Sequence, residues 1–316
     1  MVLQQSGNSS GIVVCNKMPG MTSMDVVRVM RRATGIKRVG HGGTLDPMAS
    51  GVLPVFIGQA TRVSEYLLDS PKEYTTVLCL GKTTDTYDAD GEIIQNSDYA
   101  FVSRAMFGQM VLDYIGHILQ KPPMYSALKV GGKRLYKLAR SGVEVERAYR
   151  KVIISSIDVK NWNPPFVTLH VKCGRGVYIR SLVHDLGQSL GCGAHVTELT
   201  RVRTGNFTLD DALVINNFNE KMISKVWEGF MQPMDSALVS IPAYVVEEEQ
   251  EKHVRFGEAV EMATSQIKNN KEPYRRIYNR HGYFIGIVKS LGGTNLWKPE
   301  KIFAAGKPSS LAPSKA

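Results

Sequence analysis

The sequence is poor in cysteine and has no long hydrophobic run. Its four cysteines lie far apart and form no Cys-x-x-Cys pair, which excludes a zinc ribbon and a scaffold held by disulfides. No apolar run approaches the roughly 18 residues of a membrane span, and residues 1–10 lack the basic and apolar segments of a signal peptide. We therefore expect a reduced, cytoplasmic protein without membrane contact.

Motifs for nucleotides and metals are also missing. The segment 81–83 (GKT) ends like a phosphate-binding loop, but Thr76 stands where that loop requires its first glycine. The acidic segment 85–91 has Ser97 where a calcium loop requires glutamate, so a turn between strands explains it better. The seven histidines form no His-x-x-x-His pair. The sequence thus predicts no metal and no cofactor.

Acidic residues are outnumbered, 29 against 39 basic ones, which leaves a net charge of +10. Between Gln120 and Lys151 nine basic residues face two acidic ones, so this segment carries seven of the ten charges. It also contains two prolines and two tyrosines before residue 137. This composition favours a basic arm that lies on a phosphate backbone over a merely solvated helical face.

The hydropathy pattern predicts an α+β protein. The apolar run 12–15 is typical of a buried strand, and β-branched residues predict three more strands at 73–80, 151–159 and 167–173. An amphipathic helix should begin with Ser23 as its cap and end at Gly35, and a second helix should cover 178–190.

The length suggests two domains. We expect a flexible leader at 1–10 and a main domain at 11–236, with the basic arm at 120–151 as an insertion in it. A composition break near 237–242 precedes a small β-rich domain at 242–304, which has a second basic cluster. The residues from 305 to 316 are mostly proline, serine, alanine and lysine, and are expected to form a disordered tail.

A glycine-rich loop is the most informative segment. Residues 39–53 read VGHGGTLDPMASGVL and lead into an apolar run. The glycines allow backbone geometries closed to other residues, and Pro47 keeps Asp46 out of helical geometry. A carboxylate displayed in this way can act as a nucleophile, a general base or an electrostatic partner. From these residues alone, Asp46 could equally cap the turn.

This loop, at 40–51, resembles the catalytic motif of the TruB family of tRNA pseudouridine synthases. Further blocks resemble the family in the same order: KTTDTYDADGE (82–92), KPPMYSALK (121–129), RLYKLAR (134–140), GVYIRSLVHDL (176–186) and GCGAHVTEL (191–199). The family's first motif usually places proline directly after lysine, whereas Met18 follows Lys17 here. The fixed backbone angle of that proline is therefore missing.

The resemblance implies an isomerase. In this family an aspartate, here Asp46, converts uridine 55 in the T-arm of tRNA to pseudouridine by breaking the N1 to C1′ bond and rejoining the ring through C5. Attack at C1′ or at C6 of the ring remains open. Tyr74 is implied to stack on the flipped uracil and to remove the C5 proton, Arg180 to keep Asp46 ionised, and His41 to fill the space that the flipped base leaves.

The resemblance also implies the binding residues. Tyr178 and Leu199 would line the base pocket, and the basic arm, with Lys129, Lys133 and Arg134, would grip RNA. The implied fold is a pseudouridine synthase domain with a mixed, largely antiparallel sheet and a small β-rich, PUA-like C-terminal domain that extends the RNA contact.

The expected partner is tRNA alone, bound by a monomer without guide RNA. Two alternatives remain at this stage: an RNA-guided relative of the dyskerin type, and a T-arm binder or tRNA-folding chaperone without catalysis.

Overall fold

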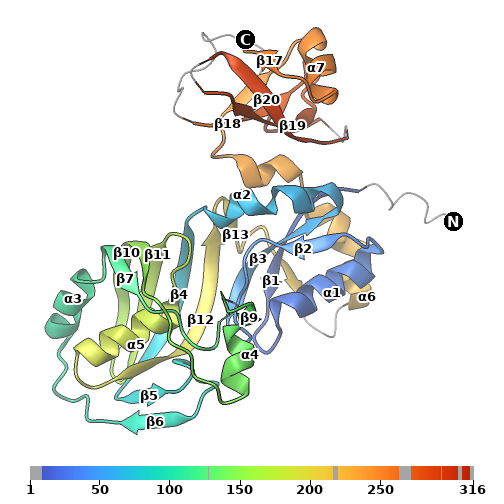
Figure 1. Cartoon of the computed structure of the whole chain (residues 1–316). Helices are drawn as coiled ribbons and strands as arrows, with labels where there is room; N and C mark the ends of the chain where they lie inside the picture. The colour runs from blue at the N-terminus through green and yellow to red at the C-terminus, as the bar shows by residue number, and fades with distance from the viewer. Residues whose placement is uncertain are drawn as a thin grey trace.

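A computed structural model describes residues 9–126, 128–215, 220–262, 272–292, 294–304 and 308–313. Within these residues a large sheet of eleven strands forms one part of the molecule and a five-stranded sheet forms the other (Figure 1). No helix among the described residues is long and apolar enough to cross a membrane.

The large sheet is mixed and largely antiparallel, as predicted. Its only parallel pairs within the described chain are β1 with β14 and β3 with β12. The strand order is β14 (Leu213–Ile215), β1 (Gly11–Lys17), β3 (Ser50–Ile57), β12 (Ala194–Thr204), β4 (Lys72–Leu80), β11 (Phe166–Cys173), β10 (Arg150–Asn163) and β7 (Gly116–Gln120). Three short strands flank it: β2 (Val39–His41) on β3, β13 (Phe207–Thr208) on β12 and β15 (Met231–Gln232) on β1.

Two amphipathic helices build the main core against this sheet (Figure 1). The apolar stripe of α1 (Ser23–Thr34) and that of α5 (Ile179–Ser189) join strand residues such as Leu53 and Leu78 in one buried cluster. The other helices are α2 (Ser64–Leu68), α3 (Arg104–Leu112), α4 (Leu135–Arg140), α6 (Glu220–Val226) and α7 (Glu248–Arg255).

The start of α1 differs from the prediction by one residue. Thr22, not Ser23, is the N-cap: its hydroxyl accepts from the Asp25 N–H, and the Asp25 carboxylate accepts from the Thr22 N–H. This reciprocal capping box satisfies two backbone groups at once. The Ser23 hydroxyl is thereby left for a contact outside the helix.

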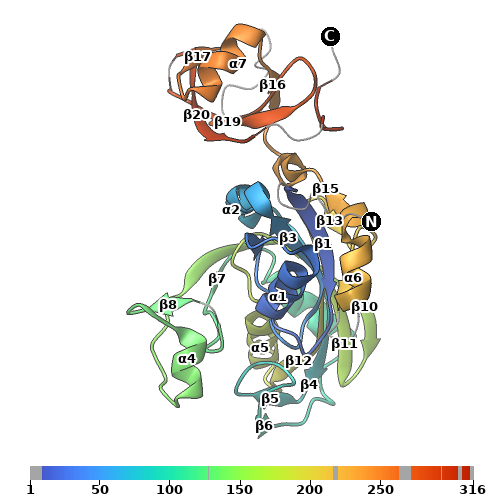
Figure 2. The same cartoon turned by 90° about the vertical axis from the view of Figure 1, so that its right-hand side faces the viewer.

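The predicted turn after residue 84 packs against β12 of the large sheet, whereas the basic arm extends away from this sheet. Residues 85–92 connect β5 (Lys82–Thr84) to β6 (Ile93–Asn96), as expected. The arm leaves the sheet after β7 and returns at β10, and it contains the hairpin of β8 (Lys129–Val130) with β9 (Lys133–Arg134), followed by α4. Figure 2 shows α4 and β8 standing away from the body of the molecule.

The small domain is a curled five-stranded sheet with α7, consistent with the expected PUA-like module. Its strand order is β16 (Ala243–Val245), β18 (Tyr274–Tyr278), β19 (Phe284–Ser290), β20 (Leu296–Ile302) and β17 (Val260–Glu261). Side chains of this sheet, among them Phe284, share one buried apolar cluster with Phe56 of β3. The Tyr278 hydroxyl also donates to the Asp235 carboxylate at 2.7 Å. The two parts therefore pack through a common core.

The two chain ends depart in part from the predicted disorder. Residues 1–8, 305–307 and 314–316 lie outside the described residues. Ser10, in the expected leader, accepts a hydrogen bond from the Gln59 N–H. Within the predicted tail, Ser309 donates to Asp235 at 2.6 Å and Pro308 pairs with Tyr283. Composition alone does not reveal such local docking.

Candidate active site

A cavity of about 300 Å³ opens where β4 and β12 lie side by side. Tyr74 and Lys72 of β4 and Leu199 and Arg201 of β12 line it. Within each strand these residues are two positions apart, so their side chains share a face of the sheet. The other lining residues come from the glycine-rich loop, α2, the arm, the turn before α5 and the first residues of α5: Gly43, Thr44, Leu45, Asp46, Leu68, Ser126, Gly174, Arg175, Gly176, Val177, Tyr178, Ile179 and Arg180.

The cavity thus brings together five of the predicted site residues, namely Asp46, Tyr74, Tyr178, Arg180 and Leu199. They come from segments that are far apart in the sequence. Their convergence from the glycine-rich loop, two strands and the start of α5 marks this cavity as the candidate active site.

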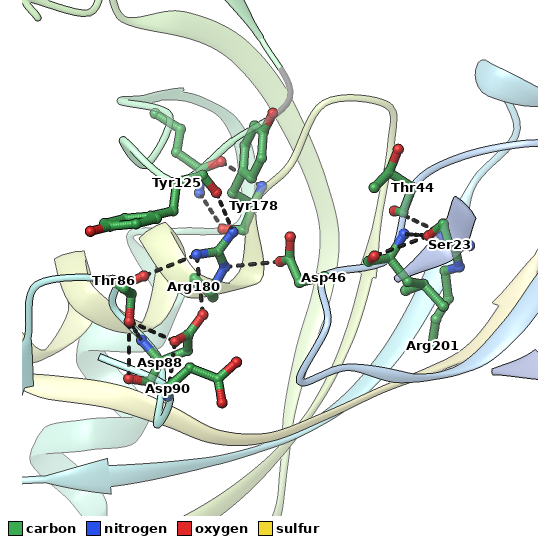
Figure 3. A network of polar contacts seen from close by, with 12 residues as sticks. Ser23, Thr44, Asp46, Thr86, Asp88, Asp90, Tyr125, Tyr178, Arg180 and Arg201 are labelled. Carbon is green, nitrogen blue, oxygen red and sulfur yellow. Dashed lines mark hydrogen bonds and ion pairs between the residues drawn. The ribbon is translucent and has the colours of Figure 1, made fainter. Parts of the chain in front are cut away.

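Arg180 is the centre of a buried ionic network (Figure 3). Its guanidinium lies 2.9 Å from an Asp46 oxygen and 3.1 Å from an Asp88 oxygen. It also donates to the carbonyl oxygens of Thr86 at 3.0 Å and Tyr125 at 2.8 Å. The Arg180 side chain is only 3% exposed. Four acceptors from three separate segments therefore fix the position of this cation.

The two carboxylates beside Arg180 differ in their surroundings. The Asp88 side chain is 6% exposed and also accepts from the Thr86 hydroxyl and the Asp90 N–H. Burial raises the pKa of Asp88, while the Thr86 hydrogen bond and the nearby Arg180 act in the opposite direction. The Asp46 side chain is 29% exposed and faces the cavity. Asp46 is therefore the carboxylate that a ligand in the cavity can reach.

The loop that carries Asp46 is clamped on both sides of this residue. The Ser23 hydroxyl accepts from the Leu45 N–H at 2.8 Å and also lies 3.0 Å from the Leu45 carbonyl oxygen. Arg201, which is 2% exposed, donates to the carbonyl oxygens of Gly43 at 3.1 Å and Val52 at 2.8 Å. Figure 3 shows Ser23 and Arg201 on the side of the loop away from Arg180.

The residue after Asp46 is held from the first motif. The carbonyl oxygen of Pro47 accepts from the Gly20 N–H at 2.9 Å and from the buried Lys17 ammonium at 3.1 Å. Burial lowers the pKa of Lys17 to about 8. Met18, which replaces the usual proline, is 38% exposed. The contact between the first motif and the loop therefore comes from Lys17 and Gly20 and does not require a proline at residue 18.

The two tyrosines of the cavity are uncharged at neutral pH. Burial is the main cause that raises the pKa of the Tyr74 phenol, and it also raises the pKa of the Tyr178 phenol. Tyr74 lies next to Arg201 in the register of β4 and β12, and Leu199 lies opposite Thr76. A neutral ring beside an apolar side chain suits stacking on a planar base.

His41, Lys133 and Arg134 are not among the described residues that line the cavity. His41 lies on β2, opposite Val55 of β3, and its Nδ1 is buried without a hydrogen-bond partner among the described residues. Burial and, to a smaller extent, Arg201 lower the pKa of His41, so the ring is neutral. Lys129 pairs with Arg134 in the hairpin of the arm, where Lys133 and Arg134 are exposed.

Sequence reasoning missed three residues of the site. Asp88 falls in a predicted turn, Ser23 is predicted as a helix cap, and no pattern in the sequence marks Arg201. The sequence did contain a signal for Asp88, because it lies in the block 82–92 that resembles the family. Among the described residues no group of His, Cys, Asp or Glu could hold a metal ion.

Comparison with protein families gives two adjoining matches. The model described as "TruB family pseudouridylate synthase (N terminal domain)" matches residues 31–179, and that of the "tRNA pseudouridylate synthase B C-terminal domain" matches residues 180–239. Both matches end before the small sheet begins at Ala243.

Known proteins resemble the chain over most of its length. A tRNA pseudouridine synthase B of Clostridium kluyveri is 43% identical over 88% of this chain and 94% of its own, and one of Dehalococcoides mccartyi is 40% identical over 94% and 98%. A chain of the crystal structure of a Cbf5-Nop10-Gar1 complex has a TM-score of 0.69 and 26% identity, covering 96% of this chain and 87% of that chain. The chain belongs to the TruB family of pseudouridylate synthases.

Proposed function

We propose that this protein converts uridine 55 in the T-arm of tRNA to pseudouridine, with Asp46 as the nucleophile. The observation that carries the proposal is the Asp46 carboxylate, which is accessible from the cavity and held 2.9 Å from the buried Arg180. The relatives named tRNA pseudouridine synthase B support tRNA as the substrate.

The isomerisation needs one nucleophile and one acceptor for a proton. Asp46 attacks either the sugar C1′ or the ring C6, and the N1 to C1′ bond breaks. The detached ring turns so that C5 forms the new bond to C1′. C5 then loses its proton, N1 carries one in the product, and Asp46 is released. The atoms balance without an oxidant, a water or a cofactor.

Each residue of the cavity has a role in this proposal. Arg180 orients the Asp46 carboxylate and balances its charge through the ion pair at 2.9 Å. Tyr74 stacks on the uracil and accepts the C5 proton, while Tyr178 and Leu199 complete the base pocket. His41 belongs to the first residues of the glycine-rich loop, and its neutral ring can occupy the gap that the flipped base leaves in the RNA.

We also propose that the protein acts as a monomer on bare tRNA in the cytoplasm, without a guide RNA. The relatives with 38–43% identity are named as tRNA enzymes, whereas the chain from the Cbf5 complex is 26% identical. The basic arm and the small domain would extend the contact to tRNA beyond the cavity.

The test is pseudouridine mapping of unmodified tRNA after incubation with the purified protein. We expect modification at one T-arm uridine without any added protein or RNA. The D46N variant should lose activity completely in a tritium-release assay, while its tRNA affinity stays within a few-fold. D210N, a change at an exposed aspartate outside the cavity, is the matched control. Turnover by D46N would exclude Asp46 as the nucleophile. Binding of tRNA by the wild-type protein without any pseudouridine formed would favour a tRNA chaperone.

A further inference from the structure

A buried lysine in the cavity has no role in the proposed reaction. Lys72 is 8% exposed and lines the cavity two positions before Tyr74 on β4. Its ammonium donates to the carbonyl oxygens of Leu68 at 2.5 Å and Ser70 at 2.6 Å. Both acceptors are neutral, and no carboxylate forms an ion pair with Lys72 among the described residues.

Capping of α2 explains only part of this arrangement. Leu68 is the last residue of α2, and lysine often binds the final carbonyl groups of a helix. An ammonium has three N–H donors, however, and the two carbonyl groups use two of them. Burial of a cation without an opposite charge is costly, and it lowers the pKa of Lys72 to about 8. A negative ligand in the cavity would supply the missing charge.

A second cation lies at the same end of the cavity. Cys173 of β11 pairs with Lys72, so the turn 174–176, with Arg175, begins beside it. Arg175 forms an ion pair with Asp69 at 2.9 Å, and both side chains are more than 60% exposed. Exposed ion pairs contribute little to stability, so a ligand can compete for this guanidinium at low cost.

The spacing along β4 relates this cationic end to the base pocket. Residues two apart in a strand have side chains on one face, separated by about 7 Å. This distance is similar to the span between a nucleobase and the phosphate of its own nucleotide. A uracil stacked on Tyr74 would therefore place a backbone phosphate near Lys72.

We propose that Lys72, with Arg175 at the rim, forms a subsite for the RNA backbone phosphate next to the nucleotide whose base enters the cavity. The inference rests on the proposed function. A phosphate here would hold the flipped nucleotide by its backbone while Tyr74 holds its base, so the subsite would position the sugar C1′ relative to Asp46.

The test combines a neutral phosphate with a neutral lysine substitute. T-arm hairpins carry a single methylphosphonate on the 5′ or the 3′ side of the target uridine, and kcat/KM is measured for wild type and K72M. At one of these two positions, the methylphosphonate should lower the kcat/KM of wild type about ten- to a hundredfold, which is the range expected for the loss of a charge-assisted hydrogen bond. K72M should show a similar loss on native RNA and little further loss on the methylphosphonate.

Controls separate the subsite from folding and from other phosphate contacts. K72R should recover much of the activity because it retains the charge, and K160M, at an exposed lysine near the far end of β10, should behave as wild type. If K72M does not fold, R175Q takes its place in the same experiment. We then expect a smaller difference between the effects of the methylphosphonate on wild type and on the variant. Thermal unfolding of each variant monitors stability.

Three outcomes would overturn the inference in distinguishable ways. If the methylphosphonate lowers kcat/KM by the same factor for K72M as for wild type, Lys72 does not contact either phosphate. Inhibition by inorganic phosphate without any methylphosphonate effect would indicate an anion site unrelated to RNA. Failure of wild type to modify the native hairpin would instead contradict the proposed function itself.

Discussion

At the scale of single residues, Arg180 holds two carboxylates in different surroundings, because Asp46 faces the cavity and Asp88 is buried. Glycines and Pro47 around Asp46 indicate a displayed carboxylate, and the family motif extends this to Arg180. Asp88 has the sequence context of a turn, and the structure does place it in one. Its burial against Arg180 depends on the docking of this turn onto β12, where Asp88 forms an isolated bridge with Val196. Such tertiary contacts have no local sequence pattern.

Asp88 should matter for catalysis more than for binding. D88N keeps the size of the side chain but removes one of the two negative charges that hold Arg180. We expect kcat to fall about ten- to a hundredfold with little change in tRNA affinity, since one charge-assisted contact is lost. D90N makes the same chemical change at an exposed position of the same turn and should leave kcat unchanged. Single-turnover kinetics and filter binding would measure both quantities. Full activity of D88N would show that Asp46 alone suffices to position Arg180.

Asp185 on α5 offers a test of the electrostatics away from the reaction. Burial raises the pKa of this carboxyl from 3.8 to about 6, and it has no hydrogen bond or ion pair among the described residues. The folded protein therefore binds more protons than the unfolded chain between these values, so this group destabilises the fold as the pH rises from about 4 to 6.

D185N removes this penalty. The shift corresponds to about 3 kcal/mol at most, and we expect roughly 1–2 kcal/mol of added stability at pH 7 because the side chain is partly exposed. The gain should disappear below pH 4. Urea unfolding at pH 7 and pH 4 would measure it, with D210N as the control. An equal effect at both pH values would mean that the carboxyl is not perturbed.

At the scale of elements, the strands and helices of the core follow from their periodicity, because β4, β10, β11, α1 and α5 are long and have strong apolar patterns. Their ends are less predictable. Thr22 and Ser23 are both good helix caps, and the local sequence does not distinguish them. The choice depends on Leu45, whose backbone groups need the Ser23 hydroxyl once the loop has packed against α1.

These neighbouring residues should therefore have separable effects. S23A removes the contacts to the Leu45 backbone, and we expect kcat to fall about tenfold with a small change in KM, since the loop that carries Asp46 is held less firmly. T22A removes the helix cap and should lower the free energy of unfolding by about 1 kcal/mol while kcat changes little. Steady-state kinetics and chemical unfolding of both variants give the comparison. The loop clamp would be excluded if S23A lost only stability.

At the scale of the whole molecule, fewer of the basic residues can contact RNA than the sequence indicates. Lys268 and Lys271 of the second basic cluster lie outside the described residues. Arg275 is 2% exposed and lies over the Trp297 ring, and Arg276 donates to the Ile241 carbonyl oxygen. This part of the cluster stabilises the small domain internally. A count of charges cannot distinguish such buried arginines from exposed ones, so the arm becomes the main candidate for phosphate contacts.

The salt dependence of tRNA binding tests this assignment. Replacing Lys129, Lys133 and Arg134 with alanine should weaken binding and reduce the slope of log K against log salt by up to about 0.9 per lost phosphate contact, because fewer counterions are released. Arg275→Gln changes a buried arginine of the small domain and should leave the slope unchanged even if it lowers stability. Because Lys133 and Arg134 are not among the described residues that line the cavity, kcat at saturating tRNA should stay within a few-fold of wild type. An unchanged slope for the triple variant would mean that these residues do not contact phosphate. The charge that binds tRNA would then have to lie elsewhere on the molecule.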